Sequence, residues 1–273
     1  MLRFDTLDGT PIAVLFNFGC HPVSLHSYRN LLSSDYPGYA REVIRGVLGA
    51  GVVAMFTMGA AGDINPAGYV AGGTHPRRSQ QIGSILGCEV AQVALDATPM
   101  AEPVLGVGHR TVALPVYPLP PVAELSALHE QAAAEAEQLR KVGAPWADIS
   151  VPEIKRDWAA DCLHAHAEGR SQEPLACELS ALRIGDAAIL MAPLEMFTAT
   201  GLAIKHGSPA VMTLVASNSN GGVGYLPTRD AYSETDYTNP EGLAPKIYGI
   251  YALTPEAEPL VSSEACSLLK ELW

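Results

Sequence analysis

His21 is the side chain of this sequence best placed to bind a metal or to transfer a proton. It follows directly on the apolar segment 13–18, which predicts a strand buried on both faces. Pro22 then restricts the backbone after the histidine. Ligands of α/β sheets bind beyond the carboxyl ends of strands, where this pattern puts His21. A lone histidine in such a place is nevertheless more often a hydrogen-bonded structural residue than a metal ligand.

A polar loop follows the next predicted strand, residues 51–57. The loop Gly59–Pro66 contains Asp63 and Asn65 among glycines that permit tight turns and a close approach of the backbone to a substrate. Because it also follows a strand, it is expected near His21. The alternative is an Asx turn in which Asp63 has only a structural role.

A third group of polar side chains lies in the C-terminal third of the chain. Glu195 follows the apolar segment 188–192 and is expected in the first turn of a helix that ends near His206, where it could bind a metal or simply complement the helix dipole. The segment 217–251 is rich in Gly, Asn, Tyr and Pro and predicts functional loops. Its tyrosines could equally be packing aromatics with a polar tip. They include Tyr225, Tyr232, Tyr237 and Tyr248.

Composition excludes several classes of function. The formal charge of −12, without a basic cluster to offset it, argues against nucleic acid as a partner. The five cysteines are widely spaced and form no Cys-x-x-Cys pair, which argues against a disulfide framework and a thiolate zinc site. No apolar run is long enough for a transmembrane segment.

Strand and helix patterns alternate along the chain and predict an α/β fold with mixed sheet layers and flanking helices. A turn at Asp8 and Gly9 joins two strands at the very start, so we expect an N-terminally truncated domain that spans 1–273. Further strands are expected at 104–117, 179–184, 187–191 and 211–216. Helices are expected at 35–48 and 79–97, and a helical insert at about 120–170 contains two more, 122–141 and 152–168. In the 79–97 helix the residues predicted to face inward are Ile82, Ile85, Leu86, Val90 and Val93.

Taken in order, the motifs resemble the catalytic domain of the neutral/alkaline non-lysosomal ceramidases and their bacterial relatives. The resemblance rests on Asn17–Pro22, Ser34–Ala40, Gly59–Pro66, Pro193–Phe197, Gly224–Tyr232 and Lys246–Gly249.

The resemblance implies a partial ceramidase-like catalytic domain with a zinc ion as its cofactor. In that family two histidines, a glutamate and a tyrosine hold zinc, and a zinc-bound water attacks the amide of an N-acyl sphingoid base. By motif, His21 matches the second histidine ligand, Glu195 the carboxylate ligand and Tyr225 the tyrosine ligand. Tyr237 matches the tyrosine that stabilises the oxyanion. The implied partner is a small or lipid-like N-acyl substrate, with peripheral membrane contact as a further possibility.

Two departures from the family pattern leave alternatives open. The family's first zinc histidine lies in a His-x-His-Ser/Thr motif, and no such motif precedes His21. The family's Gly-Asp-x-Ser-Pro-Asn segment reads Gly62–Ala67 here, with Asn65 in place of the serine, so its amide can bind a substrate oxygen but cannot act as an alkoxide. The alternatives are a metallohydrolase for a non-sphingolipid ester or amide, and a catalytically inactive scaffold with the same fold. Localisation and oligomeric state are not predicted.

Overall fold

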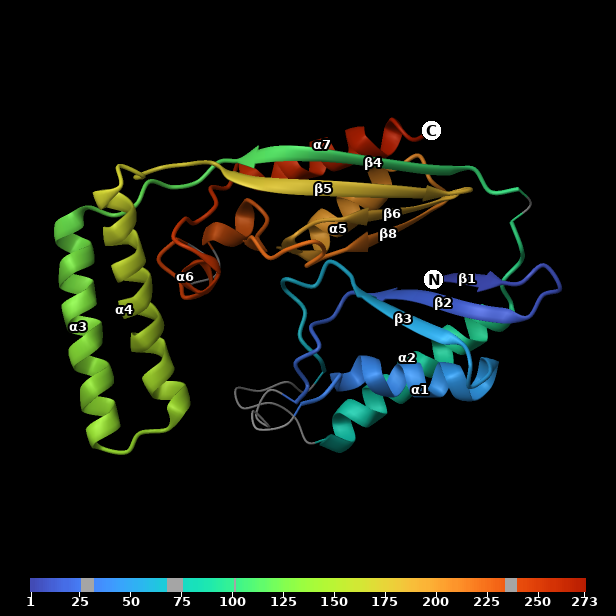
Figure 1. Cartoon of the computed structure of the whole chain (residues 1–273), viewed down its shortest axis with the longest axis horizontal. Helices are drawn as coiled ribbons and strands as arrows, with labels where there is room; N and C mark the ends of the chain where they lie inside the picture. The colour runs from blue at the N-terminus through green and yellow to red at the C-terminus, as the bar shows by residue number, and fades with distance from the viewer. Residues whose placement is uncertain (26–31, 68–75, 101, 234–239) are drawn as a thin grey trace.

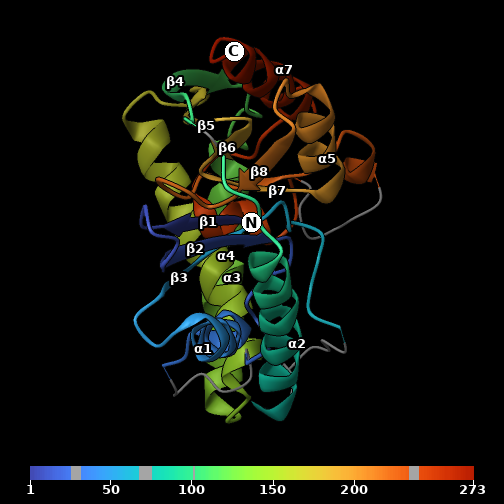
Figure 2. The same ribbon diagram turned by 90° about the vertical axis from the view of Figure 1, so that its right-hand side faces the viewer.

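Two β-sheets lie face to face between two layers of helices in the computed structural model (Figure 1). The structure describes residues 1–25, 32–67, 76–100, 102–233 and 240–273. Figure 2 shows the four layers edge on, in the order helices, sheet, sheet, helices. The predicted class, α/β with mixed sheets and flanking helices, is confirmed.

The first sheet is built from the N-terminal segment. It has the order β1-β2-β3, with β1 at Leu2–Asp5, β2 at Pro11–Phe18 and β3 at Val53–Met58. The predicted hairpin joins β1 and β2 through a turn in which Gly9 has a φ of 84°. Helix α1 (Asp35–Leu48) connects β2 to the parallel strand β3.

Helix α2 (Pro76–Leu95) packs on α1 beneath this sheet, with Val90 buried and Leu86 packed against the same core as predicted, but two other residues of the predicted inward face are exposed. Ile85 and Val93 are 64% and 53% exposed. Apolar residues of both helices share one core cluster, and glycines allow the closest approach between them. A Cβ at Gly83 would lie 2.3 Å from the Tyr36 carbonyl oxygen, and one at Gly87 would lie 2.7 Å from the Ala40 carbonyl oxygen. Large side chains on this face would therefore push the helices apart.

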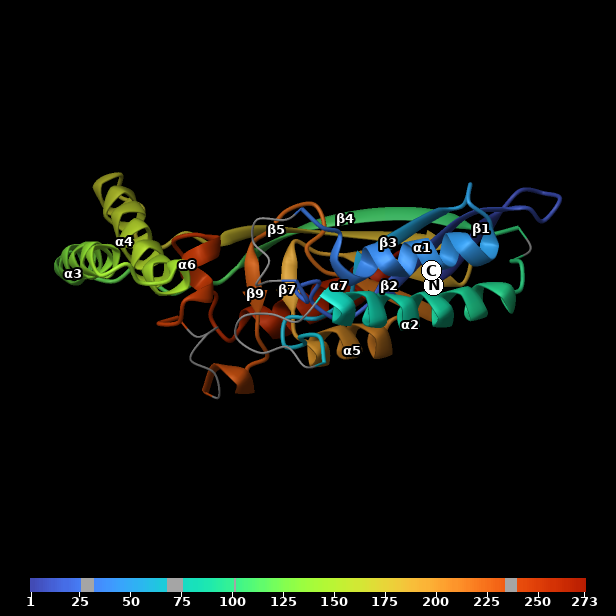
Figure 3. The ribbon, with the colours of Figure 1, turned by 90° about the horizontal axis from the view of Figure 1, so that it is seen from below.

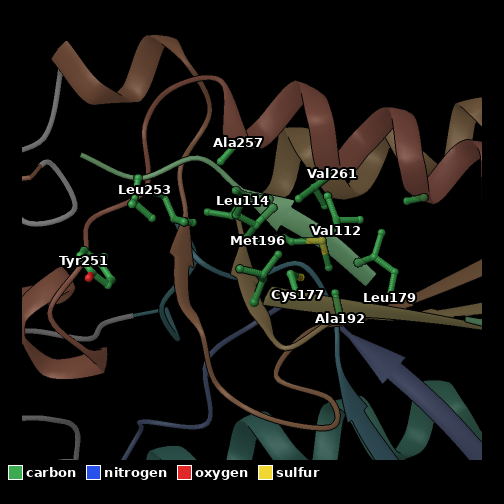
Figure 4. Packing of buried hydrophobic residues seen from close by; sticks show 14 of the residues in the cluster. Val112, Leu114, Cys177, Leu179, Ala192, Met196, Tyr251, Leu253, Ala257 and Val261 are labelled. Atoms are coloured by element: carbon green, nitrogen blue, oxygen red, sulfur yellow. The ribbon is translucent and has the colours of Figure 1, made fainter. Parts of the chain in front are cut away.

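The second sheet has the order β4-β5-β6-β8. Its strands are β4 (Leu105–Leu114), β5 (Leu175–Ile184), β6 (Ala187–Met191) and β8 (Met212–Ala216). The first three pair antiparallel, with the predicted turn at Gly185 between β5 and β6, and β8 joins β6 in parallel after helix α5 (Thr198–Gly207). Helix α7 (Ala257–Lys270) covers the outer face, and Figure 4 shows its Ala257 and Val261 beside Val112 and Leu114 of β4.

Apolar side chains fill the space between the two sheets. Leu2 of β1 and Ile189 and Leu214 of the second sheet belong to one buried cluster, against which Leu15 of β2 packs. One polar residue also ties the sheets together: the Asn17 amide donates to the Val215 carbonyl oxygen at 2.9 Å and to Thr57 Oγ1 at 3.1 Å. The carboxyl ends of β2, β3 and β8 are thereby held side by side.

Helices α3 (Val122–Lys141) and α4 (Trp146–Ala167) form an arm that projects from one end of the sandwich (Figures 1 and 3). Helix α3 has its predicted bounds. Helix α4 starts six residues before the predicted Pro152, which lies inside the helix. Because proline lacks an N–H, it favours the first turn of a helix, but burial of Pro152 in the packed arm overrides that preference.

Two three-residue strands lie between the arm and the sandwich (Figure 3). They are β7 (Leu194–Met196) and β9 (Gly224–Leu226), which pair in parallel. Two short helices follow, the 3-10 turn Asp230–Ser233 and α6 (Ala244–Tyr248). The prediction that Glu195 lies in the first turn of a helix was therefore wrong, since α5 begins only at Thr198. Strand pairing between residues thirty positions apart leaves no local periodicity to detect.

Candidate active site

His21 lies just beyond the end of β2, where its backbone is fixed from two sides. Its N–H donates to the Ile64 carbonyl oxygen at 3.0 Å, so the 59–66 loop lies against it as predicted. From α1, the Tyr36 hydroxyl donates to the carbonyl oxygen of Cys20 at 2.5 Å. Asp35 accepts hydrogen bonds from Ser24 Oγ and from the N–H of Leu25, which secures the chain after the histidine. The imidazole therefore has a defined position.

The neighbouring thiol has different chemistry. Burial raises the pKa of Cys20 to about 11, so this side chain remains a neutral thiol near pH 7. It therefore offers no thiolate beside His21.

Glu195 and Tyr225 lie directly opposite each other in the β7–β9 pair. Cross-strand partners project to the same face, which explains how residues far apart in sequence share one site. The Glu195 side chain is almost completely buried, with the residue 3% exposed. Strand β7 is held to the 59–66 loop by the Gly62 N–H, which donates to the Met196 carbonyl oxygen at 2.8 Å. A Cβ on Gly62 would lie 2.5 Å from the Glu195 carbonyl oxygen, so this approach requires glycine.

The polar ends of the three predicted metal ligands converge. His21 Nε2 lies 3.3 Å from Glu195 Oε2 and 3.5 Å from the Tyr225 hydroxyl oxygen. Glu195 Oε2 is buried and accepts no hydrogen bond within the described part of the chain. A buried carboxylate oxygen that accepts no hydrogen bond is costly, and a protonated His21 or a bound cation would compensate it.

Tyr248 completes this cluster, although sequence reasoning did not select it as a site residue. Its hydroxyl donates to Glu195 Oε1, and its ring meets the Tyr225 ring edge to face at a centroid distance of 5.9 Å. The bond fixes one carboxylate oxygen and leaves Oε2 facing His21. The sequence signal for Tyr248 was the motif Lys246–Gly249, which is one of the motifs shared with the family. No site role was assigned to its tyrosine.

A cavity of about 730 Å³ opens on this cluster. Its lining includes His21, Glu195, Tyr225, Tyr248 and Asn65, with polar residues 217–219 and apolar residues such as Val23 and Phe56 on other parts of the wall. A cavity of similar volume, about 740 Å³, lies beside α1 and contains none of the predicted site residues.

Of the two remaining predicted residues, the structure describes Asp63 alone, and Asp63 is not part of this cluster. Asp63 is not among the residues that line the cavity. Its carboxylate accepts hydrogen bonds at 2.7 Å from both the N–H and the hydroxyl of Thr198, and so it ties the 59–66 loop to the start of α5. Tyr237 lies outside the described residues.

The donor set fits a zinc ion. Ligand bonds of 2.0–2.1 Å in a tetrahedron separate neighbouring donor atoms by about 3.3 Å. The two measured separations, 3.3 and 3.5 Å, agree with that edge length. Within the described residues no three His, Cys, Asp or Glu side chains form a metal-binding group, and the third donor here is a tyrosine hydroxyl.

Comparisons with known proteins identify the fold. No protein-family model matches the sequence, and no curated protein matches it either. Among solved structures, the crystal structure of neutral ceramidase from Pseudomonas aeruginosa is similar over 99% of this chain and 45% of its own, with 18% identity and a TM-score of 0.63. A structure described as ceramidase complexed with C2 is similar over 99% of this chain and 47% of its own, with 16% identity and a TM-score of 0.64. The chain has the ceramidase fold.

The likeness covers slightly less than half the length of each solved ceramidase. It therefore corresponds to a partial ceramidase-like domain, in agreement with the resemblance carried by the sequence motifs. Among the described residues, no helix is both long enough and apolar enough to cross a membrane.

Proposed function

We propose that this chain provides the active site of a zinc-dependent hydrolase that cleaves the amide bond of a ceramide-like or related N-acyl substrate. His21, Glu195 and Tyr225 would hold the metal. The observation that carries the proposal is the buried Glu195 Oε2, which accepts no hydrogen bond from the described residues and lies 3.3 Å from His21 Nε2 at the wall of a cavity. The ceramidase fold supports the choice of an amide as the substrate bond.

Each residue of the cluster has a chemical role in this proposal. A zinc ion held by His21, Glu195 and Tyr225 would supply a water molecule of lowered pKa and would polarise the substrate carbonyl. Tyr248 holds the Glu195 carboxylate in one orientation through its hydrogen bond to Oε1. Asn65 is exposed on the cavity wall, where its amide can donate a hydrogen bond to the substrate carbonyl oxygen as charge develops there. Val23 and Phe56 provide apolar surface for a lipid-like chain.

Zinc content and amide hydrolysis, measured on the same preparations, test the proposal. We expect about one equivalent of zinc in the purified protein and hydrolysis of a fluorogenic N-acyl amide. His21→Ala and Glu195→Ala should lose both. The matched control is His164→Ala, because that side chain is 72% exposed on the arm. A folded protein that takes up no zinc when zinc is supplied would refute the catalytic proposal and favour an inactive scaffold, whereas zinc-dependent cleavage of esters alone would favour the other metallohydrolase.

A further inference from the structure

A second, smaller cavity adjoins the candidate site. It has a volume of about 390 Å³, and Tyr248 lines both cavities. The chain also passes between them near β9, because residues 218 and 219 line the larger cavity, residues 222 and 223 the smaller one, and Tyr225 the larger one again. The two cavities are therefore neighbours with a common wall. Tyr248, whose hydroxyl donates to Glu195, is part of that wall.

Apolar atoms form somewhat more than half of the inner surface of the small cavity. Leu175, Val223 and Ile250 line it and are partly buried side chains that pack on the edge of the main hydrophobic core. Gly222 adds open space, because a Cβ built on it would meet no atom within 4 Å. Half-covered apolar surface of this kind gains free energy when an apolar ligand removes it from water.

The charged residues of the small cavity do not make it an anion site. The Arg170 guanidinium is paired with the Glu168 carboxylate at 2.6 Å, which offsets its charge. Glu173, the acidic residue of the lining, is exposed to solvent. Among the described residues of this lining, a carboxylate or phosphate would find no unpaired cation, whereas an alkyl chain would meet Leu175, Val223 and Ile250.

We propose that the small cavity is a subsite for one apolar arm of the amide substrate, while the reacting amide and its other arm occupy the larger cavity. The inference rests on the proposed amide hydrolysis for the nature of the substrate. An amide joins two arms at the reacting carbonyl, so a site that accepts both arms needs space in two directions from that carbon. Tyr248 lines both spaces, and its hydroxyl donates to Glu195 at the reaction centre.

Filling the subsite with a new side chain tests the inference. Gly222→Val adds bulk where the cavity is open, and its backbone is not in the left-handed region. Gly249→Val is a second filling variant, since a Cβ there also meets no atom within 4 Å. Gly51→Val is the matched control, because its Cβ position is equally open but lies beside α1, away from both cavities.

The first readout is kcat/KM for N-acyl amides in which either the acyl or the amine arm is lengthened one methylene at a time. In the wild type we expect a gain of about fourfold per methylene for the arm that enters the subsite. Gly222→Val should abolish that gain and leave the shortest substrate and the other arm unaffected. The inference is overturned if both filling variants keep the full dependence on both chain lengths, or if they slow the shortest substrate equally.

The second readout does not require hydrolysis. Binding of laurate and of dodecylamine to the wild type is measured by displacement of a fluorescent fatty-acid probe. The subsite predicts that at least one of them binds and that Gly222→Val weakens this binding at least tenfold, while Gly51→Val does not. This result would support the subsite even if no amide were cleaved. Amide cleavage without any effect of the filling variants on binding or on chain-length dependence would leave the proposed function standing and remove the subsite, as would a wild type that binds neither probe.

Discussion

Replacement of Glu195 by glutamine should have opposite effects on the stability of the zinc-free and the zinc-bound protein. In the zinc-free protein, the buried Oε2 atom accepts no hydrogen bond from the described residues. The amide of Glu195→Gln keeps an acceptor for the Tyr248 hydroxyl and turns the other atom into a donor, 3.3 Å from His21 Nε2. The variant therefore removes a buried charge and satisfies the orphaned position, but it also removes a zinc ligand.

The expected magnitudes follow from burial. A hydrogen bond to a buried polar group that had none should raise the free energy of unfolding by about 1–2 kcal/mol. In a chain of this size, each kcal/mol raises the melting temperature by about 2–4 °C. Zinc at a hundred times its dissociation constant should stabilise the wild type by about 2.7 kcal/mol, or roughly 5–11 °C, and should not stabilise the variant. The order of the two melting temperatures should therefore invert when zinc is added.

Thermal unfolding in a chelating buffer and in a zinc-containing buffer measures this inversion. Glu258→Gln is the matched control, because Glu258 accepts hydrogen bonds from Thr200 and Ser262 away from the cavity. The control should lose a little stability and keep the full response to zinc. The reasoning is refuted if Glu195→Gln lowers the melting temperature in the chelating buffer, or if zinc stabilises it as much as the wild type.

Two further predictions concern residues beside the site, and a third concerns two cysteines away from it. Tyr248→Phe removes the hydrogen bond to Glu195 Oε1 and should weaken zinc affinity about 10–100-fold without unfolding the protein, as measured by competition with a chelating dye. Asp63→Ala removes the two hydrogen bonds at the start of α5 and should cost about 1–2 kcal/mol in urea unfolding, with zinc affinity retained if the residue only positions the loop. Cys88 is exposed and should react rapidly with a thiol reagent at pH 8. Burial raises the pKa of Cys162 to about 12, so this cysteine should stay a neutral thiol at that pH and react only when the chain unfolds; rapid labelling of the folded protein would contradict this.

Local patterns in the sequence determined much of the fold. Apolar runs bounded by turn residues identified the strands on which His21 and the 59–66 loop depend, and helical periodicity gave α3 its bounds. These predictions succeeded because a strand or helix of normal length carries its own repeat of apolar residues. The resemblance to the ceramidase family implied that His21, Glu195 and Tyr225 form one site, and the distances of 3.3 and 3.5 Å show that the three side chains do meet.

Only the tertiary structure decided how those side chains are held together. The β7–β9 pair has three residues in each strand, too short for a periodic signal, yet it sets Glu195 opposite Tyr225. Contacts of this kind depend on loop closure over long sequence separations, which no local window contains. The exposure of Ile85 and Val93 on α2 was likewise decided by its neighbour, because the helix turns Gly83 and Gly87 toward the backbone of α1. The same long-range packing brings Tyr248 to Glu195, and so it determines which carboxylate oxygen is left without a partner beside His21.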